Sequence, residues 1–267
     1  MYISEYYIPS HITGFFVPWF SDDYLKTGST GAGVSLLIGL KTEISITNGD
    51  GTVDVYLNGI KTSNEKVPVS INCINILKER YQENLKNKDI IIRHYSDVPV
   101  EAGFGASASA VLGICFSIKD FLSITSERCI EIAHETEVKN LSGLGDVIAE
   151  VKGGIEIRKT PGVSGIIENI KLKEDLKVLA LSLGTKKTES VLRDPEKIKI
   201  IEKCGTKMLS KLINEPTVEK MMECSRTFTY KINIFPKEIL GLVDRISEIN
   251  SFNASGIMIG KGVFTFV

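Results

Sequence analysis

One stretch of the amino-acid sequence, "PVEAGFGASASA" at residues 99–110, has residue types that could hold phosphate. Gly103 and Gly105 alternate with other residues just before Ser107, and a mostly apolar run follows from 108 to 118. This pattern predicts a glycine loop that leads into a buried helix. The first turn of a helix presents unpaired backbone N–H groups and the positive end of the helix dipole, which favour an anion. We therefore expect this stretch to hold the phosphates of ATP.

The glycine-rich segment 99–110 also fits other nucleotide-binding motifs in part. "GFGASA" fits the dinucleotide pattern G-x-G-x-x-[GA], but that motif needs a strand running directly into the glycines and an acidic residue on a second strand about 20 residues later. Here Pro99 separates strand from loop, and the region around Glu127 has a helical pattern. A Walker loop would need G-K-[ST], which does not follow. A purely structural glycine turn remains the alternative.

Two carboxylates favour a functional interpretation. Glu137 and Asp146 lie on either side of "VKNLSGLG", and a glycine-rich bend of this length can return both side chains to one cleft. There they could supply a magnesium ligand and a base for a substrate hydroxyl. Each alone could be a surface carboxylate, but Asp146 stands between glycines and an apolar run that ends in Gly153 and Gly154, an unfavourable backbone context for a merely solvated residue.

The histidines are less informative. His134 and Glu137 have an H-x-x-E spacing on one helix face, which could begin a metal site, but no second copy and no H-E-x-x-H is present. His11 could be a core residue bonded to backbone as readily as a site residue, and His94, at the end of a strand, is assigned no role. The five widely spaced cysteines are expected to be reduced residues of the core.

Strands must position the first part of this site. Alternating β-branched residues predict an antiparallel sheet, and the turns "NGDG" at 48–51 and "NG" at 58–59 predict hairpins. The expected strand segments are "EYYIPS" with "HITGFF", "GVSLLIGL", "KTEISIT", "TVDVYL" and "DIIIRHY". Apolar spacing predicts a helix over 69–85, and Ser126 is a candidate cap for a helix through "ERCIEIAHETEVKN". A short apolar segment "VIAEV" then stops at Gly153, and "IEIRKT" alternates like a strand.

The character of the chain changes near Pro161. "GIIENIKL" and "KVLALSLG" are strand-like, three helical patterns follow over 194–213, 217–232 and 236–249, and "ASGIMIGKGVFTFV" closes with two strand-like segments. No repeat, low-complexity tract or flexible linker separates the halves, so we expect them to share an interface.

Composition excludes several classes of function. The chain has 267 residues, 43% of them hydrophobic, which suffices for one large domain or two packed lobes. Lys+Arg 32 against Asp+Glu 33 gives a formal charge of −1. The sequence has no basic cluster interleaved with aromatic residues, so we do not expect it to bind nucleic acid. The N-terminus does not resemble a signal peptide, and no apolar run approaches about 18 residues. We expect a soluble, cytoplasmic protein without a membrane partner.

The combined motifs resemble the GHMP kinase superfamily over most of the chain. "PVEAGFGASASA" is similar to its phosphate motif P-x-x-x-G-[LF]-G-S-S-[AG]-[AS], and "EVKNLSGLGDVIAEVKGG" is similar to its glutamate, glycine turn, catalytic aspartate and double glycine. The resemblance implies an α+β fold of two lobes, an N-terminal ribosomal-protein-S5-like β/α lobe over 1–160 and a C-terminal α+β lobe over 161–267. It also implies ATP and Mg²⁺ as cofactors and a homodimer.

The resemblance also implies roles for individual residues. It makes Ser107 a ligand of magnesium and phosphate, Glu137 the magnesium-associated glutamate and Asp146 the catalytic aspartate. The nucleotide-binding residues it implies are Gly103, Gly105, Ala106, Ser107, Ala108 and Ser109. Whether Asp146 removes the hydroxyl proton or only orients the hydroxyl stays open.

Within the superfamily, "IPSHITGFF", "TGSTGAGV" and "AHETEVKN" with "GLGDV" are most similar to the archaeal-type pantoate kinases, which act in coenzyme A biosynthesis. This narrower resemblance implies that Ser29, His134 and Arg158 bind pantoate. Their chemistry suits its carboxylate and hydroxyls, since a guanidinium can meet a carboxylate with two parallel N–H bonds.

Some residues depart from the superfamily pattern. Ser10 replaces the usual glycine, Ala106 replaces the first motif serine, and His11 follows "PS" where many relatives have a lysine that supports the aspartate. The third, glycine-rich motif appears only as "ASGIMIGKG". The alternatives are a kinase of the same fold with another small acceptor, such as mevalonate, shikimate or homoserine, and a non-catalytic sensor of nucleotide or metabolite. Retention of Ser107, Glu137 and Asp146 together argues against the sensor.

Overall fold

The chain forms helices and strands in two lobes, seen in a computed structural model that describes residues 1–171, 176–185, 189–258 and 260–267. A seven-stranded sheet with the order β4-β3-β5-β2-β6-β7, to which β1 adds by pairing with β2, forms the N-terminal lobe. A three-stranded sheet with the order β8-β10-β9 belongs to the C-terminal lobe. The expectation of an α+β protein is confirmed.

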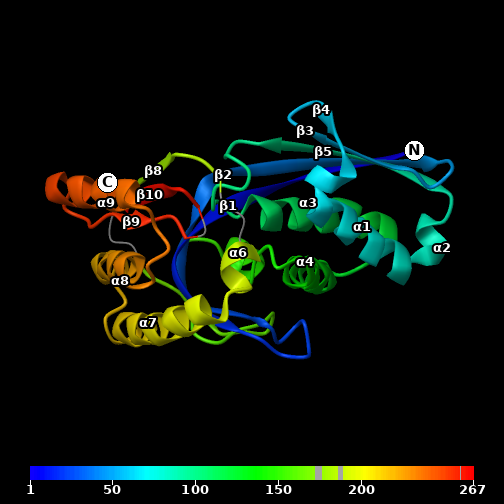
Figure 1. The fold of residues 1–267 in the computed structure, drawn as a ribbon. Helices are drawn as coiled ribbons and strands as arrows, with labels where there is room; N and C mark the ends of the chain where they lie inside the picture. The colour runs from blue at the N-terminus through cyan, green and yellow to red at the C-terminus, as the bar shows by residue number, and fades with distance from the viewer. Residues whose placement is uncertain (172–175, 186–188, 259) are drawn as a thin grey trace.

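A long hairpin of β1 (Tyr2–Trp19) and β2 (Gly28–Asn48) runs through the molecule (Figure 1). The edge of β2 that does not pair with β1 pairs with two strands. Residues 40–48 pair with β5 (Lys88–Ser96), and residues 31–34 pair with β6 (Ile155–Arg158). The β1–β2 register shifts between Pro9 and His11 and again between Thr13 and Phe15. Irregularities of this kind bend a strand and redirect its side chains.

Helices cover one face of the large sheet (Figure 1). The buried helix α3 (Ala106–Leu122) lies at their centre, as its nearly all-round apolar sequence predicted, with α1 (Pro68–Arg80) and α4 (Ser126–Asn140) packed against it. The remaining helices of this lobe are η1 (Asn64–Lys66), α2 (Gln82–Leu85) and α5 (Asp146–Lys152). His94 of β5 is buried, and its ring nitrogens lie 2.9 Å from Thr42 Oγ1 and 3.1 Å from Ser70 Oγ.

One predicted hairpin is wrong. The strand after "NGDG", β3 (Val53–Leu57), does not pair with β2 but runs parallel to β5, which lies between them. The turn is held instead by Asp89, whose Oδ1 accepts hydrogen bonds from the backbone N–H groups of Gly51 and Thr52. Because the segment between β3 and β5 is long and includes α1, the chain can cross over and place β5 between the two strands. The second hairpin, β3 with β4 (Ile60–Thr62) across "NG", is confirmed.

The predicted helix cap at Ser126 is also wrong by one residue. Thr125 precedes α4 with extended backbone, and its hydroxyl accepts the backbone N–H of Arg128. Ser126 is instead the first residue of the helix. Both residues could cap in principle, and the backbone conformation of Thr125 decides between them.

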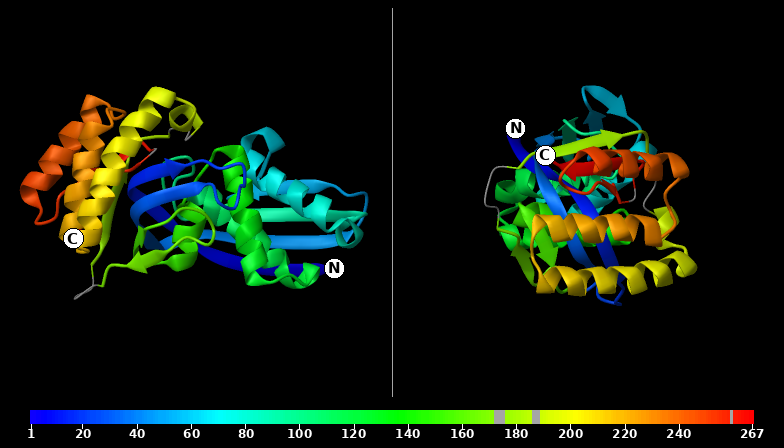
Figure 2. Two further views of the ribbon diagram at one scale, coloured as in Figure 1. Left: turned by 90° about the horizontal axis from the view of Figure 1, so that it is seen from below. Right: turned by 90° about the vertical axis from the view of Figure 1, so that its left-hand side faces the viewer.

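Three helices stack on the small sheet to make the C-terminal lobe (Figure 2). Each falls where the apolar spacing predicted it: α7 (Pro195–Asn214), α8 (Val218–Lys231) and α9 (Lys237–Ile249). The strands are β8 (Val178–Ser182), β9 (Ser255–Gly256) and β10 (Gly262–Phe266), and a short α6 (Glu189–Leu192) precedes α7. Leu172 and Ile259, which belong to two predicted strand segments, lie outside the described residues.

The two lobes share one core, as expected. Ile12, Phe15 and Phe16 of β1 belong to the same buried cluster as Phe228 of α8 and Val263 of β10. The rings of Phe16 and Phe228 meet edge to face with centroids 6.0 Å apart. The short strand β7 (Ile167–Asn169) pairs with β6, so the large sheet continues beyond residue 160, and the expected division at 160 and 161 stays a prediction.

Two smaller points complete the fold. All five cysteines are free, and four of them are buried. Among the described residues, no helix combines the length and apolar character needed to cross a membrane.

Candidate active site

A cleft of about 300 Å³ runs along the N-terminal end of α3. One end reaches the loop that precedes α1, and the other end reaches Thr13, Ser29 and Asp146. Leu192 and Met258 contribute to its wall from the C-terminal half of the chain. The residues that line it between the two ends include the loop 103–107 and the bend 140–145. This volume is at the lower end of the range of about 300–1,000 Å³ that is typical of small-molecule sites.

The glycine loop adopts the backbone expected of an anion-binding loop. Gly103 and Gly105 have φ angles of +85° and +68°, which residues with a Cβ rarely adopt. Gly105 is the N-cap of α3 and provides no side chain to bond the first turn. The N–H groups that open the helix are therefore not bonded by a cap side chain and are available to an anion.

Ser107 and Glu137 meet at the entrance to α3. Ser107 Oγ donates to Glu137 Oε2 over 3.0 Å, and Ser142 Oγ donates to Glu137 Oε1 over 2.7 Å. Burial raises the pKa of Glu137 to about 7 and the charge of Asp146 adds to the rise, while the two serine bonds oppose it. A buried carboxylate with a raised pKa is stabilised in its charged form by a nearby cation.

Asp146 lies at the start of α5 and is held from the strand side. His11 Nδ1 lies 2.8 Å from Asp146 Oδ1, and Thr13 Oγ1 donates to the same oxygen over 3.4 Å. The side chain of Asp146 is 26% exposed, whereas that of His11 is fully buried. Burial alone would raise the pKa of Asp146, but the hydrogen bond and charge of His11, with the charge of Arg158, lower it overall. Asp146 is therefore an ionised carboxylate at neutral pH.

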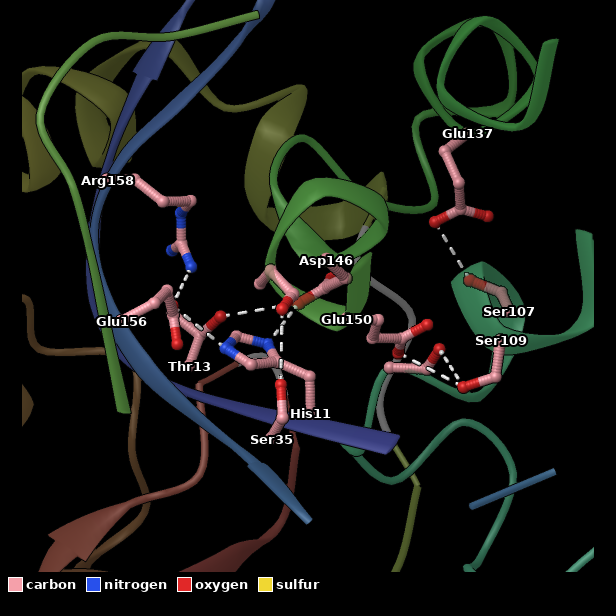
Figure 3. Close-up of polar contacts among 12 residues, drawn as sticks. His11, Thr13, Ser35, Ser107, Ser109, Glu137, Asp146, Glu150, Glu156 and Arg158 are labelled. Atoms are coloured by element: carbon pink, nitrogen blue, oxygen red, sulfur yellow. Dashed lines mark hydrogen bonds and ion pairs between the residues drawn. The ribbon is translucent and has the colours of Figure 1, made fainter. Parts of the chain in front are cut away.

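Figure 3 shows how the groups are arranged around Asp146. On one side a chain of contacts runs from His11 to Glu156 and on to Arg158, and on the other side lie Glu137 and Ser107. A Cβ built on Gly143 would come within 2.5 Å of Glu137 Oε2 and 3.1 Å of Asp146 Oδ2. The glycine bend therefore brings the two predicted carboxylates together and leaves the space between them clear.

Arg158 and Ser29 converge beside this bend. A Cβ on Gly145 would collide with Ser29 Oγ and lie 3.0 Å from Arg158 Nε. Arg158 is 2% exposed and bonds Glu156 through Nη1, but its Nε and Nη2 have no hydrogen-bond partner in the described part of the chain. Buried donors of this kind are unfavourable unless a partner reaches them, and a carboxylate presents two matching oxygens.

Several other predicted site residues are buried behind the cleft lining. His134 is buried, and its Nε2 donates to the backbone carbonyl of Thr27 over 2.8 Å, one residue before β2 begins. Ser109 is buried and donates to Glu150 Oε1 over 3.1 Å, away from the cleft. Ala106 lines the cleft, and Ala108 is packed in the core of the helix layer. His134 thus positions the hairpin that carries Ser29, and Ser109 supports the loop from behind.

Sequence reasoning missed several residues of this cluster. Thr13 and Glu156 both bond site residues, Gly143 keeps the space between carboxylates open, and Glu150 lies behind Gly105. For Glu156 the sequence held no signal, because "IEIR" alternates apolar and charged residues like a half-exposed strand, and only the structure shows that all four residues are buried. A charged residue on each inward position of a buried strand indicates a polar network rather than a solvated face.

The cluster suits magnesium and the phosphates of ATP. Ser107 and Glu137 present a hydroxyl and a carboxylate, which are oxygen ligands of the kind that Mg²⁺ prefers. The unbonded first turn of α3 and the loop 103–105 suit phosphate oxygens. These residues fit the group that the sequence motif implies.

Comparison with known proteins agrees with this geometry. The GHMP kinases N terminal domain matches residues 69–154. A solved phosphotransferase related to the CoA biosynthesis pathway superposes with a TM-score of 0.88 at 34% identity, covering 99% of this chain and 88% of that one. The fold is therefore the two-lobed GHMP kinase fold, as the motifs predicted, and the site belongs to a GHMP kinase.

Two relatives narrow this class. The pantoate kinase of Thermococcus kodakarensis is 37% identical over 98% of this chain and 86% of its own. That of Methanocaldococcus jannaschii is 32% identical over 97% of this chain and 90% of its own. The chain belongs to the pantoate kinase family.

Proposed function

We propose that the protein is an ATP- and magnesium-dependent kinase that phosphorylates a hydroxyl of pantoate, giving 4-phosphopantoate and ADP. One observation carries the class of acceptor: within the described residues the buried guanidinium of Arg158 has two donors without a partner, and it lies beside Ser29 next to the bend that leads to Asp146. A small molecule with a carboxylate for Arg158 and a hydroxyl for Asp146 fits this spacing. Pantoate has both groups, as do mevalonate, shikimate and homoserine, and the similarity to pantoate kinases favours pantoate among them.

Acceptor binding rests on Arg158 and Ser29. Arg158 Nε and Nη2 would donate to the two oxygens of the carboxylate, and Ser29 Oγ would bond an oxygen of the same molecule. His134 contributes by fixing the start of β2 through Thr27. Binding at this end places the acceptor against the bend 143–145, next to Asp146.

Nucleotide binding rests on the loop 103–107 and the first turn of α3. Backbone N–H groups there would hold phosphate oxygens, while Ser107 and Glu137 would hold the metal ion. ATP supplies the phosphoryl group, and Mg²⁺ neutralises its charge when both are bound. The cleft extends from these residues to Lys66 and Pro68, which leaves room for the rest of the nucleotide.

Asp146 acts on the acceptor hydroxyl. His11 and Thr13 occupy Oδ1, so Oδ2 is the oxygen that can accept the hydroxyl hydrogen bond. As the hydroxyl oxygen bonds to the γ-phosphorus, the bond from that phosphorus to the β-phosphate oxygen breaks and the hydroxyl proton passes to Asp146. Phosphoryl transfer depends mainly on positioning and charge neutralisation, so a carboxylate with a lowered pKa suffices.

The acceptor is tested by coupled measurement of ADP release with pantoate, mevalonate, shikimate and homoserine. We expect ATP- and Mg²⁺-dependent turnover with pantoate and at most background release with the others. Turnover with another acceptor and none with pantoate would refute the proposal.

Asp146→Ala and Asp146→Asn test the mechanism. Both variants should lose kcat by roughly 10²- to 10⁴-fold, since no side chain accepts the hydroxyl proton, while ATP binding measured by calorimetry stays close to that of the unaltered protein. Activity within a few-fold of the unaltered protein would contradict this role.

The homodimer remains a prediction of the resemblance.

A further inference from the structure

A chain of buried charged groups lies beneath Asp146. His11 Nδ1 lies 2.8 Å from Asp146 Oδ1, and His11 Nε2 lies 3.0 Å from Glu156 Oε1. Glu156 Oε1 also accepts from Arg158 Nη1. His11 and Glu156 are fully buried. The charges alternate in sign from Asp146 through His11 and Glu156 to Arg158, which makes such a buried set tolerable.

The two contacts of the His11 ring favour its imidazolium form. Each ring nitrogen faces a carboxylate oxygen, and ionised carboxylates only accept hydrogen bonds. A neutral imidazole has one N–H, whereas the imidazolium has two and satisfies both partners. In agreement, burial would lower the pKa of His11, but the charge of Glu156 and the bonds to Asp146 and Glu156 raise it to about 9.

The surrounding backbone is shaped around this ring. A Cβ on Gly33, which pairs near His11 across the β1–β2 hairpin, would collide with His11 Nε2. His11 and Thr13 are two residues apart on β1, so they face the same side of the strand, and both reach Asp146. The backbone N–H of His11 also donates to the carbonyl of Phe104 in the glycine loop over 3.1 Å. His11 thus touches both the loop and the aspartate.

We propose that His11 and Glu156 are positioning residues that lock the acceptor-binding arginine and the catalytic aspartate into one geometry. His11 is a fixed cation that keeps Asp146 ionised and turns its Oδ2 toward the acceptor. Glu156 is the carboxylate shared by His11 and Arg158, so it sets the distance between the carboxylate-binding and hydroxyl-binding groups. This rests on the proposed function, and it assigns to His11 the supporting role that a lysine has in many relatives.

The first test needs no turnover. The chain contains three histidines, and burial lowers the pKa of His94 to about 4 and also lowers that of His134. In ¹⁵N-labelled protein at pH 7.5 we expect one imidazolium, lost in His11→Gln, and two neutral rings. Glu156→Gln should make the His11 ring neutral. A neutral His11 in the unaltered protein would overturn the proposal even if the protein is inactive with pantoate.

The second test uses steady-state kinetics across pH. The groups that face Asp146 are His11, Arg158, Glu137 and Glu150, and those that face His11 are Asp146 and Glu156. At saturating ATP and Mg²⁺ the metal ion keeps Glu137 ionised, so the acid limb of kcat reports Asp146. Without the His11 charge the pKa of Asp146 rises, and in His11→Gln this limb should move up by about one pH unit. We expect kcat at pH 7 to fall by roughly 10- to 100-fold, with the KM for ATP within about twofold.

Variants of Arg158 and Glu156 should differ in their effects on the KM for the acceptor and on the acid limb of kcat. Arg158→Lys should raise the KM for the acceptor and leave the acid limb unchanged. Glu156→Gln should raise the KM for the acceptor and also move the acid limb up, because Glu156 holds both His11 and Arg158. The matched control is Glu135→Gln, a buried carboxylate of α4 paired with Arg80 of α1 and Lys139, which should leave the profile unchanged.

The outcomes separate the two proposals. An active protein whose acid limb is the same in His11→Gln would refute the positioning role. Absence of turnover with pantoate in the unaltered protein would refute the proposed function and leave the histidine charge to decide the inference. If Glu156→Gln does not fold, His11→Gln and the charge state of the unaltered protein still decide it.

Discussion

Gly143 stands at the narrowest point between the two carboxylates of the site. A side chain there would enter the space beside Glu137 Oε2 and Asp146 Oδ2, at 2.5 and 3.1 Å. Its φ is not positive, so alanine is compatible with the backbone and its effect would come from the occupied space. The glycine is thus required by the carboxylates it separates rather than by the turn.

Gly143→Ala should therefore impair metal use more than stability. The added methyl group displaces Glu137, so we expect kcat to fall by at least about tenfold and the Mg²⁺ concentration for half-maximal activity to rise. Gly241→Ala is the matched control, because a Cβ at that helical position meets nothing within 4 Å. Equal magnesium dependence in both variants would contradict this account of the bend.

Glu150 is a buried carboxyl group behind the glycine loop. Burial and the charges of Asp146 and Glu137 raise its pKa well above the usual value, although Ser109 donates to it. A carboxyl group that binds its proton more tightly in the folded chain stabilises the fold at acid pH, and this contribution is lost as pH rises above the unfolded pKa of about 4.3. As the pH rises, the unfolded chain loses this proton before the folded chain does, so the free energy of unfolding falls.

Glu150→Gln should remove that dependence, since glutamine stays neutral. Between pH 5 and pH 8 the free energy of unfolding of the unaltered protein should fall relative to that of the variant, as measured by urea titration. The other titrating groups are common to both proteins and cancel in the comparison. A difference between them that is constant with pH would show that Glu150 is ionised throughout.

Helix α4 brings Glu137 to the site, and its N-terminus depends on Thr125. Thr125→Ala removes the hydroxyl that accepts the N–H of Arg128 and should cost about 1 kcal/mol, or roughly 2–4 °C in Tm. Ser126→Ala changes the neighbouring hydroxyl, which is not the cap, and should lower Tm by less. A larger loss at Ser126 than at Thr125, measured by thermal melting, would contradict the assigned cap.

The strands also show where local patterns stop being informative. Alternation identified β3 and β5 because each residue's face is encoded locally, but it does not name the neighbouring strand. "NGDG" therefore predicted a hairpin, and Asp89, 37 residues from Thr52, holds the turn in another arrangement. The helices were found more completely, since apolar spacing marks their buried faces and, for α3 and α5, the glycines Gly105 and Gly153 mark an end.

A single core joins the two lobes of the molecule. Phe228 of α8 packs against Phe15 and Phe16 of β1, and this strand also carries His11 and Thr13 to the site. The lobes are therefore expected to unfold together, since neither can lose its packing without exposing the other.

Phe228→Ala tests this coupling. Loss of a buried phenylalanine should cost about 3–5 kcal/mol and lower the Tm of one common calorimetric transition by roughly 6–15 °C. Phe20→Ala, at a position 53% exposed, should change Tm little. Two separate transitions, only one of them shifted in Phe228→Ala, would contradict a shared core.

Local chemistry alone predicted the glycine loop, the buried helix after it and the pair of carboxylates, because backbone freedom, apolar spacing and residue type are all visible over short stretches. It did not predict that His11 and Asp146, 135 residues apart, are bonded, or that Glu156 joins His11 to Arg158. Those partners depend on how β1, β2, β6 and α5 meet. A hydrogen bond requires two groups within about 3 Å, and only the packed chain decides which groups come that close.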